Sequence, residues 1–362
     1  MSKFIGILGY RGAVGQYVLN CLKDKYPIKC GQRSESIKRE KGIKYVKIDI
    51  LNRNELESFC KNCNVIINCA GPSYYLSKGI AEVSKEKNIG YVDIFGVDIF
   101  KTLGESKNNT IILGAGSLPG LSGMLPAWMK NKMDTDNIEK MKIYAGGNEE
   151  VTTVACVDYL LSIFRGFGKS DVYCSEGKVS KSTKESVILP EVFPSNSMGF
   201  EYLTEEMMLS ASKNKIQELH WYNVQIQTSY KNIMNEAFLQ VLKNPKKDNI
   251  FQVAKKVKDK ILKDTENTEK WYRIWIEAVK DGRMESCGFK CDNSSIISGK
   301  IAAICAEKLY DFNNNPGIYW PFEVLNSEQV LETLISEGIL KVIQPDKDSS
   351  FQYNLEYEVG EI

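Results

Sequence analysis

A glycine-rich loop close to the N-terminus has the spacing that lets a protein backbone hold a phosphate group. Glycines at positions 9, 12 and 15 follow a short apolar run and precede an amphipathic segment. In such a loop the first glycine permits a tight turn, the second lets the backbone approach a diphosphate, and the third lets helix and strand pack closely. Amide groups at the start of the helix then face the anion. The residues expected at this phosphate site are Gly9, Tyr10, Arg11, Gly12, Ala13, Val14 and Gly15.

The segment Gly-Gln-Arg-Ser at 31–34 stands where a dinucleotide-binding protein distinguishes its cofactor. Proteins that prefer NAD tend to have an acidic residue here, which accepts hydrogen bonds from the adenosine ribose. This chain has Arg33 instead, and a guanidinium offers a planar pair of donors to the 2′-phosphate of NADP. Ser34 adds a hydroxyl donor, and Arg11 is expected to flank the same phosphate. The sequence therefore favours NADP(H) over NAD(H) as the cofactor. The alternative is that Arg33 is only a solvated surface residue.

Two further segments end predicted strands at the edge of the sheet where ligands of open parallel sheets bind. The first contains Asp49 and Ile50, which are placed to touch the adenine or else only to precede a helix. The second is Asn-Cys-Ala-Gly-Pro at 68–72, whose small residues let the backbone lie along the ribose and nicotinamide. A plain strand-end turn is the alternative there. The cofactor residues expected in this second segment are Cys69, Ala70, Gly71 and Pro72.

Candidate catalytic and substrate-binding residues lie at neighbouring strand ends. Tyr91 and Asp93 end the fifth strand, where Asp93 is suited either to hold a substrate amine or to cap a turn. Tyr74 follows the Gly-Pro turn and reaches either the pocket or the core. Arg165, at the end of an apolar helical run, is the candidate partner of a substrate carboxylate, with a helix-dipole role as its alternative. The single histidine, His220, lies in an alternating segment and is interpreted as structural.

Hydrophobic periodicity supplies the elements that position these residues. Strand-like runs occur at 3–9, 28–31, 43–48, 64–69, 90–94 and 110–114, and they alternate with helical segments at 12–25, 52–60 and 75–87. Asn52 or Asn54 is the expected cap of the second helix. This alternation is typical of βαβ units, so we expect an α/β domain with a Rossmann-type parallel sheet over residues 1–125.

A second domain of the α+β class, with a mostly antiparallel sheet, is expected over residues 126–293. Alternating runs at 138–145 and 218–228 predict strands. Asp281-Gly282 between two further alternating runs predicts a tight type I′ hairpin. The C-terminal segment, residues 294–362, begins with another apolar helix and is expected to pack back on the first domain.

Composition narrows the classes of protein to which the chain belongs. Its 362 residues include 47 basic and 46 acidic side chains, so a net charge of +1 gives no reason to expect nucleic acid or a membrane as partner. No apolar run approaches the roughly 18 residues of a membrane span, and the N-terminus lacks a secretory pattern, so a cytoplasmic location is expected. The ten cysteines include one CxxC pair, Cys60 and Cys63, without a second pair, so we expect reduced thiols and no metal.

Three stretches, taken together with the glycine loop, resemble the saccharopine dehydrogenase/reductase family of NADP-binding proteins. The first is residues 66–96, which contain an Asn-x-Ala-Gly-Pro motif at 68–72 and a Tyr-x-Asp motif at 91–93. The second is residues 113–129, with a Gly-x-x-Pro-Gly turn at 116–120 that leads into a helix. The third is the C-terminal pair of a Gly/Ala-rich helix at 298–308 and the segment PGIYWPFEVL at 316–325. The resemblance covers residues 1–130 best.

This resemblance implies an NADPH-dependent reductase that acts on the C=N bond of an amino-acid-derived imine. Both a small-molecule substrate and a carrier-bound, thiazoline-type imine fit that implication. Two alternatives are open, namely an enoyl reductase that acts on a C=C bond and a non-catalytic protein that senses NADP. A homodimer formed through the second domain is a further expectation by analogy of fold.

Overall fold

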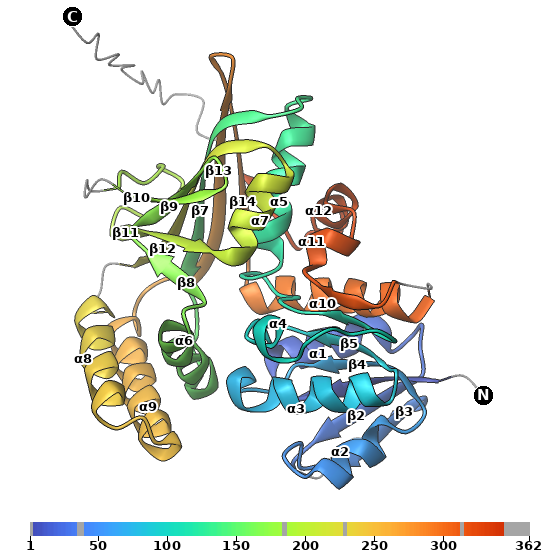
Figure 1. The fold of residues 1–362 in the computed structure, drawn as a ribbon. Coiled ribbons are helices and arrows are strands. Elements are labelled where there is room, and N and C mark those ends of the chain that lie inside the picture. Colours follow the sequence, from blue (N-terminus) through green and yellow to red (C-terminus); the bar gives the residue numbers. More distant parts are fainter. Residues whose placement is uncertain (1–2, 35–39, 183–186, 227–229, 312–314, 344–362) are drawn as a thin grey trace, which may run out of the picture.

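The computed structural model describes residues 3–34, 40–182, 187–226, 230–311 and 315–343. Two sheets dominate the molecule, and helix α10 lies between them (Figure 1). One sheet is built mainly from the N-terminal third of the chain and the other mainly from the middle.

The first sheet has seven strands, all parallel, in the order β15-β6-β5-β4-β1-β2-β3. Its strands are β1 (Phe4–Leu8), β2 (Ile28–Gln32), β3 (Ile43–Lys47), β4 (Cys63–Asn68), β5 (Gly90–Asp93), β6 (Thr110–Ile112) and β15 (Gly317–Tyr319). The helices between them are α1 (Ala13–Leu22), α2 (Arg53–Cys60), α3 (Ser73–Glu86) and α4 (Ile99–Thr102). The predicted Rossmann-type parallel sheet is confirmed.

Apolar side chains on both faces explain why this sheet lies between layers of helices. Along β1, Ile5 and Ile7 face a core that includes residues of α1 and α10, while a second core lies against α2 and α3. The Asn52 side chain accepts hydrogen bonds from the N–H groups of Asn54 and Glu55 and so caps α2. Of the two predicted caps, Asn52 is therefore the one that the structure uses.

A buried lysine joins β2 to the C-terminal end of α2. Lys29 is 5% exposed, and its ammonium donates to the carbonyl oxygens of Ser58, Phe59 and Lys61 at 3.4, 2.5 and 3.3 Å. These carbonyls carry the negative end of the helix dipole, and among the described residues only that of Ser58 also accepts a backbone N–H, from the C-cap Lys61. Burial lowers the pKa of Lys29. The cation thus satisfies acceptors that the end of α2 leaves free.

The second sheet has nine strands and is mostly antiparallel, as predicted, with a parallel pairing between β7 and β12. Its strands are β7 (Ile138–Asn148), β8 (Gly168–Ser170), β9 (Val172–Ser175), β10 (Lys178–Lys181), β11 (Ser197–Thr204), β12 (Ile216–Ile226), β13 (Trp271–Lys280), β14 (Arg283–Cys291) and β16 (Lys341–Ile343). Asp281 and Gly282 connect β13 to β14 with φ of 49° and 72°, the positive angles that a type I′ turn needs. Helices α5 (Leu121–Lys132) and α7 (Glu205–Lys213) pack against this sheet through a common core.

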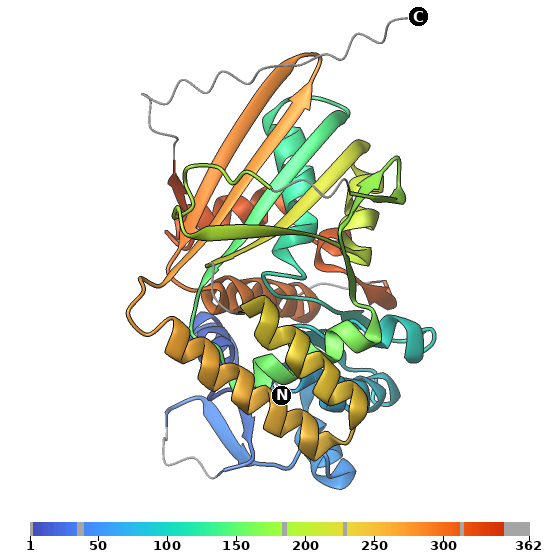
Figure 2. The same cartoon turned by 90° about the vertical axis from the view of Figure 1, so that its left-hand side faces the viewer.

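A helical lobe lies beside the two sheets. Helix α6 (Thr153–Arg165) packs against α9 (Lys247–Asp264), and α9 packs against α8 (Tyr230–Lys243), around a core of their own. Figure 2 shows α8 and α9 side by side on the outside of the molecule. Phe251 of α9 stacks on Tyr75 of α3 with ring centroids 6.4 Å apart, so the lobe reaches the first domain. Among the helices of the described ranges, none has both the length and the apolar character that crossing a bilayer requires.

The C-terminal segment returns to both sheets. Helix α10 (Ser294–Asp311) packs against α1, and β15 joins the edge of the first sheet beside β6. Helices α11 (Pro321–Val324) and α12 (Ser327–Ser336) contact α5, and β16 pairs with β14 at the edge of the second sheet. The sequence predicted that residues 294–362 pack back on the first domain. The described part of this segment contacts the first sheet and the second sheet as well, and residues 312–314 and 344–362 lie outside the described residues.

Candidate cofactor and substrate site

The glycine loop joins the end of β1 to the start of α1, and its three glycines have different surroundings. A Cβ at Gly9 would lie 2.6 Å from the amide nitrogen of Ala70, and one at Gly15 would lie 2.7 Å from the Cα of Tyr10. Neighbouring backbone fills both positions, so these glycines serve packing. At Gly12 a Cβ would meet only the Gly9 carbonyl oxygen, at 3.5 Å, and would otherwise point into open space. The middle glycine thus leaves room for a ligand where the other two leave none.

The first turn of α1 presents amide groups beside this open space. Gly12 is the N-cap and has no side chain that could accept their hydrogen bonds, and Gln16 N–H bonds to the Gly12 carbonyl at 2.9 Å. The N–H groups of Ala13, Val14 and Gly15 therefore precede the hydrogen-bonded ladder of the helix. With the positive end of the helix dipole behind them, they form a site suited to a diphosphate.

Polar side chains gather between the glycine loop and the end of β2. The Arg11 guanidinium donates to Ser34 Oγ at 2.8 Å, and Arg33 is exposed beside Ser34. Gln32, the last residue of β2, has a buried Oε1 that finds no hydrogen-bond partner among the described residues. An orphaned acceptor next to exposed guanidinium groups fits a ribose hydroxyl and a phosphate. The structure thus places Arg11 beside the segment expected to select the cofactor, and the selection itself stays a prediction.

Asp49 and Ile50 follow β3 and begin the loop to α2. The Asp49 carboxylate accepts the Leu51 N–H at 3.1 Å, and the Asp49 N–H donates to Glu55 at 2.8 Å. Asp49 is exposed, while Ile50 packs against the core under α2. Both residues therefore shape the loop that precedes the helix, and their contact with an adenine stays a prediction.

The turn after β4 lies against the glycine loop. Cys69 donates its N–H to the Leu8 carbonyl at 2.9 Å, and the Ala70 backbone fills the space beside Gly9. Pro72 follows a cis peptide bond and is the N-cap of α3. The two backbone segments predicted to hold the cofactor are therefore neighbours at the carboxyl ends of β1 and β4.

A buried hydrogen-bond network underlies this turn. Asn68 donates through Nδ2 to the Asp93 carboxylate at 2.9 Å and to Ser77 Oγ at 3.3 Å, while its Oδ1 accepts the Ala70 N–H at 3.0 Å. Tyr91 donates its hydroxyl to the same carboxylate. Asp93 and Tyr91 have no exposed surface, and burial raises the pKa of both.

This burial changes the role that the sequence indicated for Asp93 and Tyr91. A catalytic group must contact the substrate, and both side chains are instead enclosed and bonded to each other. They act as positioning residues, because Asp93 holds Asn68 and Asn68 holds the backbone of the turn at 69–72.

The same turn meets the second domain through α6. Asp158 of α6 accepts the N–H groups of Ser73 and Tyr74 at 3.0 and 3.4 Å, and so caps α3 from outside its own domain. A Cβ at Gly71 would lie 2.6 Å from Cγ1 of Val154, so α6 rests directly on the turn. Burial raises the pKa of Asp158 to about 6. The turn therefore lies where the part of the chain that builds the first sheet meets the part that builds the second, a place called the domain junction below.

Tyr74 and Arg165 belong to one cluster of aromatic and charged side chains at this domain junction. The Tyr74 hydroxyl is buried with no hydrogen-bond partner in the described part of the chain, and its ring packs on Phe95 with centroids 5.5 Å apart. Burial raises the pKa of Tyr74, the charges of Asp98 and Asp158 raise it further, and Arg165 lowers it. The structure thus brings together two residues that the sequence named separately.

Asp98 and Asp158 are the members of this cluster that sequence reasoning missed. Asp158 is the one charged residue in the helical run 153–164, and a carboxylate within such a run indicates a specific partner. That signal was available in the sequence. Asp98 offered none, because an aspartate just before a short helix is what an ordinary cap looks like.

A fully buried glutamate holds the connection between the domains. Glu206, in the first turn of α7, accepts the Gly120 N–H at 2.8 Å and the Ser122 hydroxyl at 2.6 Å. Gly120 is the N-cap of α5 and has no side chain of its own, so Glu206 caps that helix in its place. Burial raises the pKa of Glu206 to about 7.

His220 lies in the second sheet, away from the domain junction. Its Nδ1 is 2.6 Å from a carboxylate oxygen of Glu201, and its ring stacks on Tyr173 with centroids 4.3 Å apart. These contacts hold the ring and its Nδ1 within the sheet, in keeping with a structural role, while the buried Nε2 finds no hydrogen-bond partner among the described residues.

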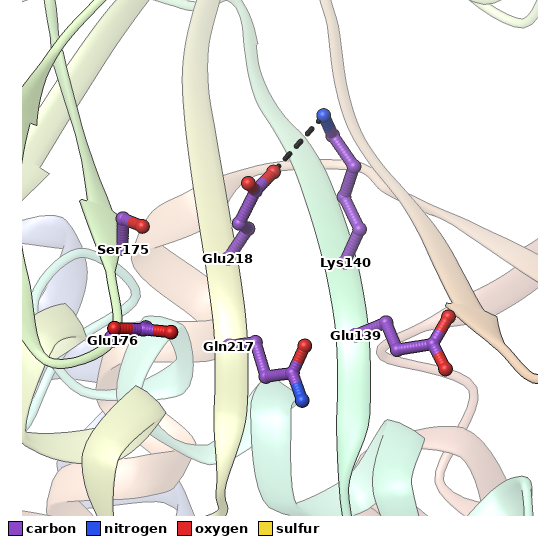
Figure 3. Close-up of a pocket in the computed structure, with 6 residues that line it drawn as sticks. All are labelled: Glu139, Lys140, Ser175, Glu176, Gln217 and Glu218. Carbon is purple, nitrogen blue, oxygen red and sulfur yellow. Dashed lines mark ion pairs between the residues drawn. The ribbon is translucent and has the colours of Figure 1, made fainter. Parts of the chain in front are cut away.

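A depression of about 370 Å³ lies near the start of β7 and β12 (Figure 3). Its lining residues are Glu139, Lys140, Ser175, Glu176, Gln217 and Glu218. Glu218 and Lys140 pair with each other at 3.1 Å, so these two charges are already matched. The other end of β7, which leads into α6 and the domain junction, is roughly 30 Å away along the strand. The depression is therefore separate from the place where β7 leads into α6.

The cysteines are free thiols, as expected for reduced side chains. Cys60 and Cys63 are buried, and burial raises their pKa to about 12 and about 11. Within the described ranges, no three His, Cys, Asp or Glu side chains are grouped so that they could hold a metal ion. The thiols of the CxxC pair pack as small apolar groups.

Comparison with known proteins finds a family model that matches the N-terminal part of the chain and a solved structure that shares its fold. Residues 5–88 match the model of the NAD dependent epimerase/dehydratase family. Apo saccharopine dehydrogenase (L-Glu forming) from Saccharomyces cerevisiae is similar in structure, with a TM-score of 0.60 and 13% identity over 94% of this chain and 100% of that chain. The chain has the fold of that dehydrogenase.

Another solved structure is more distant. DAP dehydrogenase from C. glutamicum gives a TM-score of 0.45 and 12% identity over 92% of this chain and 98% of that chain. No curated protein matches the sequence.

Proposed function

We propose that this chain is an NADPH-dependent oxidoreductase and, more narrowly, a reductase of C=N bonds in amino-acid-derived imines. The observation that carries the proposal is the open space at Gly12, at the start of α1 and beside the exposed Arg11 and Arg33. A diphosphate on the helix amides explains why, of the three glycines in the loop, Gly12 is the one that faces open space. The fold shared with saccharopine dehydrogenase and the family match over residues 5–88 support the same proposal.

Different residues near the glycine loop would bind different parts of the cofactor. Arg33, Arg11 and Ser34 would hold the 2′-phosphate, and the orphaned Oε1 of Gln32 would accept a ribose hydroxyl. The turn at 69–72 would lie along the nicotinamide riboside, because it stands at the carboxyl end of β4. Bound NADPH supplies a hydride.

The substrate would then meet the cofactor at the domain junction, where Tyr74, Phe95 and Arg165 gather. Side chains from both domains meet there and exclude water, which favours hydride transfer over side reactions. Reduction of a protonated imine needs correct alignment and no strong acid. This chemistry needs no histidine as an acid, and the only histidine of the chain, His220, is bonded to Glu201 within the second sheet.

Titration with NADPH and with NADH, followed by nicotinamide fluorescence, tests the cofactor. We expect wild type to bind NADPH at least about tenfold more tightly, because a charge-assisted bond to the 2′-phosphate is worth about 1.5–3 kcal/mol. Arg33→Asp should abolish that preference, since a carboxylate repels the phosphate. Arg283→Asp, at a hairpin position whose side chain is 63% exposed, is the matched control and should preserve it. Equal affinity of wild type for both cofactors would remove the case for Arg33.

Oxidation of NADPH in the presence of test substrates then decides the reaction. Turnover with cyclic imines and not with enoyl thioesters is the expected outcome. Turnover with enoyl thioesters alone would replace the proposal by an enoyl reductase, and NADPH binding without turnover of either class would replace it by a sensor.

A further inference from the structure

The cluster at the domain junction has aromatic walls drawn from both domains. Tyr74 and Phe95 come from the first domain, and Phe167 and Tyr202 come from the second. The Phe95 ring contacts Tyr74 and Phe167 edge-on, with centroids 5.5 and 5.0 Å apart. Tyr202 packs against Gly168, where any Cβ would overlap its ring. Faces of such rings attract cations and repel anions.

The charges of the cluster are arranged with carboxylates inside and cations outside. Asp93 is fully buried beneath the cluster, and Asp98 and Asp158 are partly buried within it. The two cations whose charges act on Asp98 are Arg165 and Lys78, and both are exposed. Because water screens the exposed charges most, the interior of the cluster has a negative potential.

Asp98 is the carboxylate in this cluster that caps no helix. It occupies the N-cap position of α4, but its side chain makes no cap hydrogen bond. Burial raises the pKa of Asp98 and the charge of Asp93 adds to that, whereas a hydrogen bond from its own backbone lowers it. Asp158, in contrast, accepts two backbone N–H groups of α3. A partly buried carboxylate with only its own backbone as donor in the described part of the chain, beside the orphaned Tyr74 hydroxyl, is stabilised when it meets a cation.

We propose that the substrate enters this cluster as a cation, a protonated imine whose nitrogen is held by Asp98 and whose apolar body lies against Tyr74 and Phe95. A substrate carboxylate is then unnecessary, and Arg165 at the rim balances Asp98. Addition of a hydride to the iminium carbon moves the C=N π pair onto nitrogen, so the cation becomes a neutral amine while the reduced nicotinamide is oxidised. This inference rests on the proposed function and specifies its substrate class.

Two cyclic imines of similar size test the charge of the substrate, namely 2-methyl-1-pyrroline and 1-pyrroline-2-carboxylate. The first lacks a carboxylate and the second carries one. With NADPH, we expect kcat/KM to be at least about tenfold higher for 2-methyl-1-pyrroline, the size of a modest charge-assisted contact. Asp98→Asn should raise KM for that imine at least about tenfold, with a smaller effect on kcat. Asp136→Asn, an exposed position before β7, is the matched control and should change neither.

Calorimetric titration of the protein–NADP⁺ complex with 2-methylpyrrolidinium gives a readout that is independent of turnover. We expect Asp98→Asn to weaken its binding at least about tenfold and Asp136→Asn to leave it unchanged. If neither imine is reduced, the imine-reductase function fails, yet loss of amine binding in Asp98→Asn still supports a cation site. Unchanged binding and unchanged KM in Asp98→Asn would overturn the inference. A preference for 1-pyrroline-2-carboxylate that disappears in Arg165→Gln would also overturn it.

Discussion

Replacement of Glu206 by glutamine is expected to change how the stability of this protein depends on pH. Burial raises the pKa of this carboxyl from 4.5 to about 7 in the folded state. The carboxyl of Glu206 therefore binds its proton more tightly in the folded state than in the unfolded state. The resulting stabilisation is complete below the unfolded pKa of 4.5 and is lost as pH rises through about 7.

The size of this effect follows from the difference between the two pKa values. One unit of pKa is about 1.4 kcal/mol, so a change from 4.5 to about 7 corresponds to about 3 kcal/mol of unfolding free energy. Roughly 2 to 3 kcal/mol of this stabilisation is lost as the pH rises from 5 to 8. Glutamine keeps an oxygen that accepts the Gly120 N–H, and its amide donates to the Ser122 oxygen, so the cap survives without a charge.

Urea unfolding followed by tryptophan fluorescence, at pH 5 and at pH 8, measures the effect. We expect the unfolding free energy of Glu206→Gln, measured relative to that of wild type, to be about 2 to 3 kcal/mol higher at pH 8 than at pH 5. Other buried carboxyls titrate in both proteins and cancel in this comparison. Glu205→Gln is the matched control, because that neighbouring side chain is 58% exposed and should show no such change. A relative stability of Glu206→Gln that is the same at both pH values would refute the reasoning.

Two other substitutions separate ligand binding from packing. Gly12→Ala should weaken NADPH binding at least about tenfold at an unchanged melting temperature, because the added methyl points into open space. Gly15→Ala should lower the melting temperature, because its Cβ meets backbone, and the reverse pattern in the two variants would contradict the assignment of the crevice. Lys29→Met should lower the unfolding free energy by about 2 kcal/mol, since three carbonyls at the end of α2 lose their donor. Urea unfolding measures it, and a loss below about 0.5 kcal/mol would contradict the capping role.

The parts of the fold that sequence predicted well are those with a long local pattern. Local patterns predicted the first five strands, the Asn52 cap and the Asp281-Gly282 turn. They could do so because periodicity and positive φ depend on residues close in sequence. Strands β8 to β11 were not anticipated. Three of them have three or four residues, too few to show a period, and they exist because neighbouring strands pair with them.

The site was predictable to the extent that backbone geometry defines it. Glycines 9, 12 and 15 and the turn at 69–72 lie together as expected, because each follows a strand of one parallel sheet. The role of individual side chains was harder. Tyr91 and Asp93 end a strand at the ligand edge, but their side chains turn into the interior, and strand position alone does not reveal that.

By itself, the sequence determined where a glycine loop leads into the first helix, because the start of a helix and the absence of a Cβ are local properties. It also determined that Arg33 and not an acid follows β2. Only the tertiary structure decided which carboxylates are enclosed and which are partly exposed. Asp98 and Asp158 meet across a domain junction from positions 60 residues apart, and burial at such a junction depends on how distant segments pack.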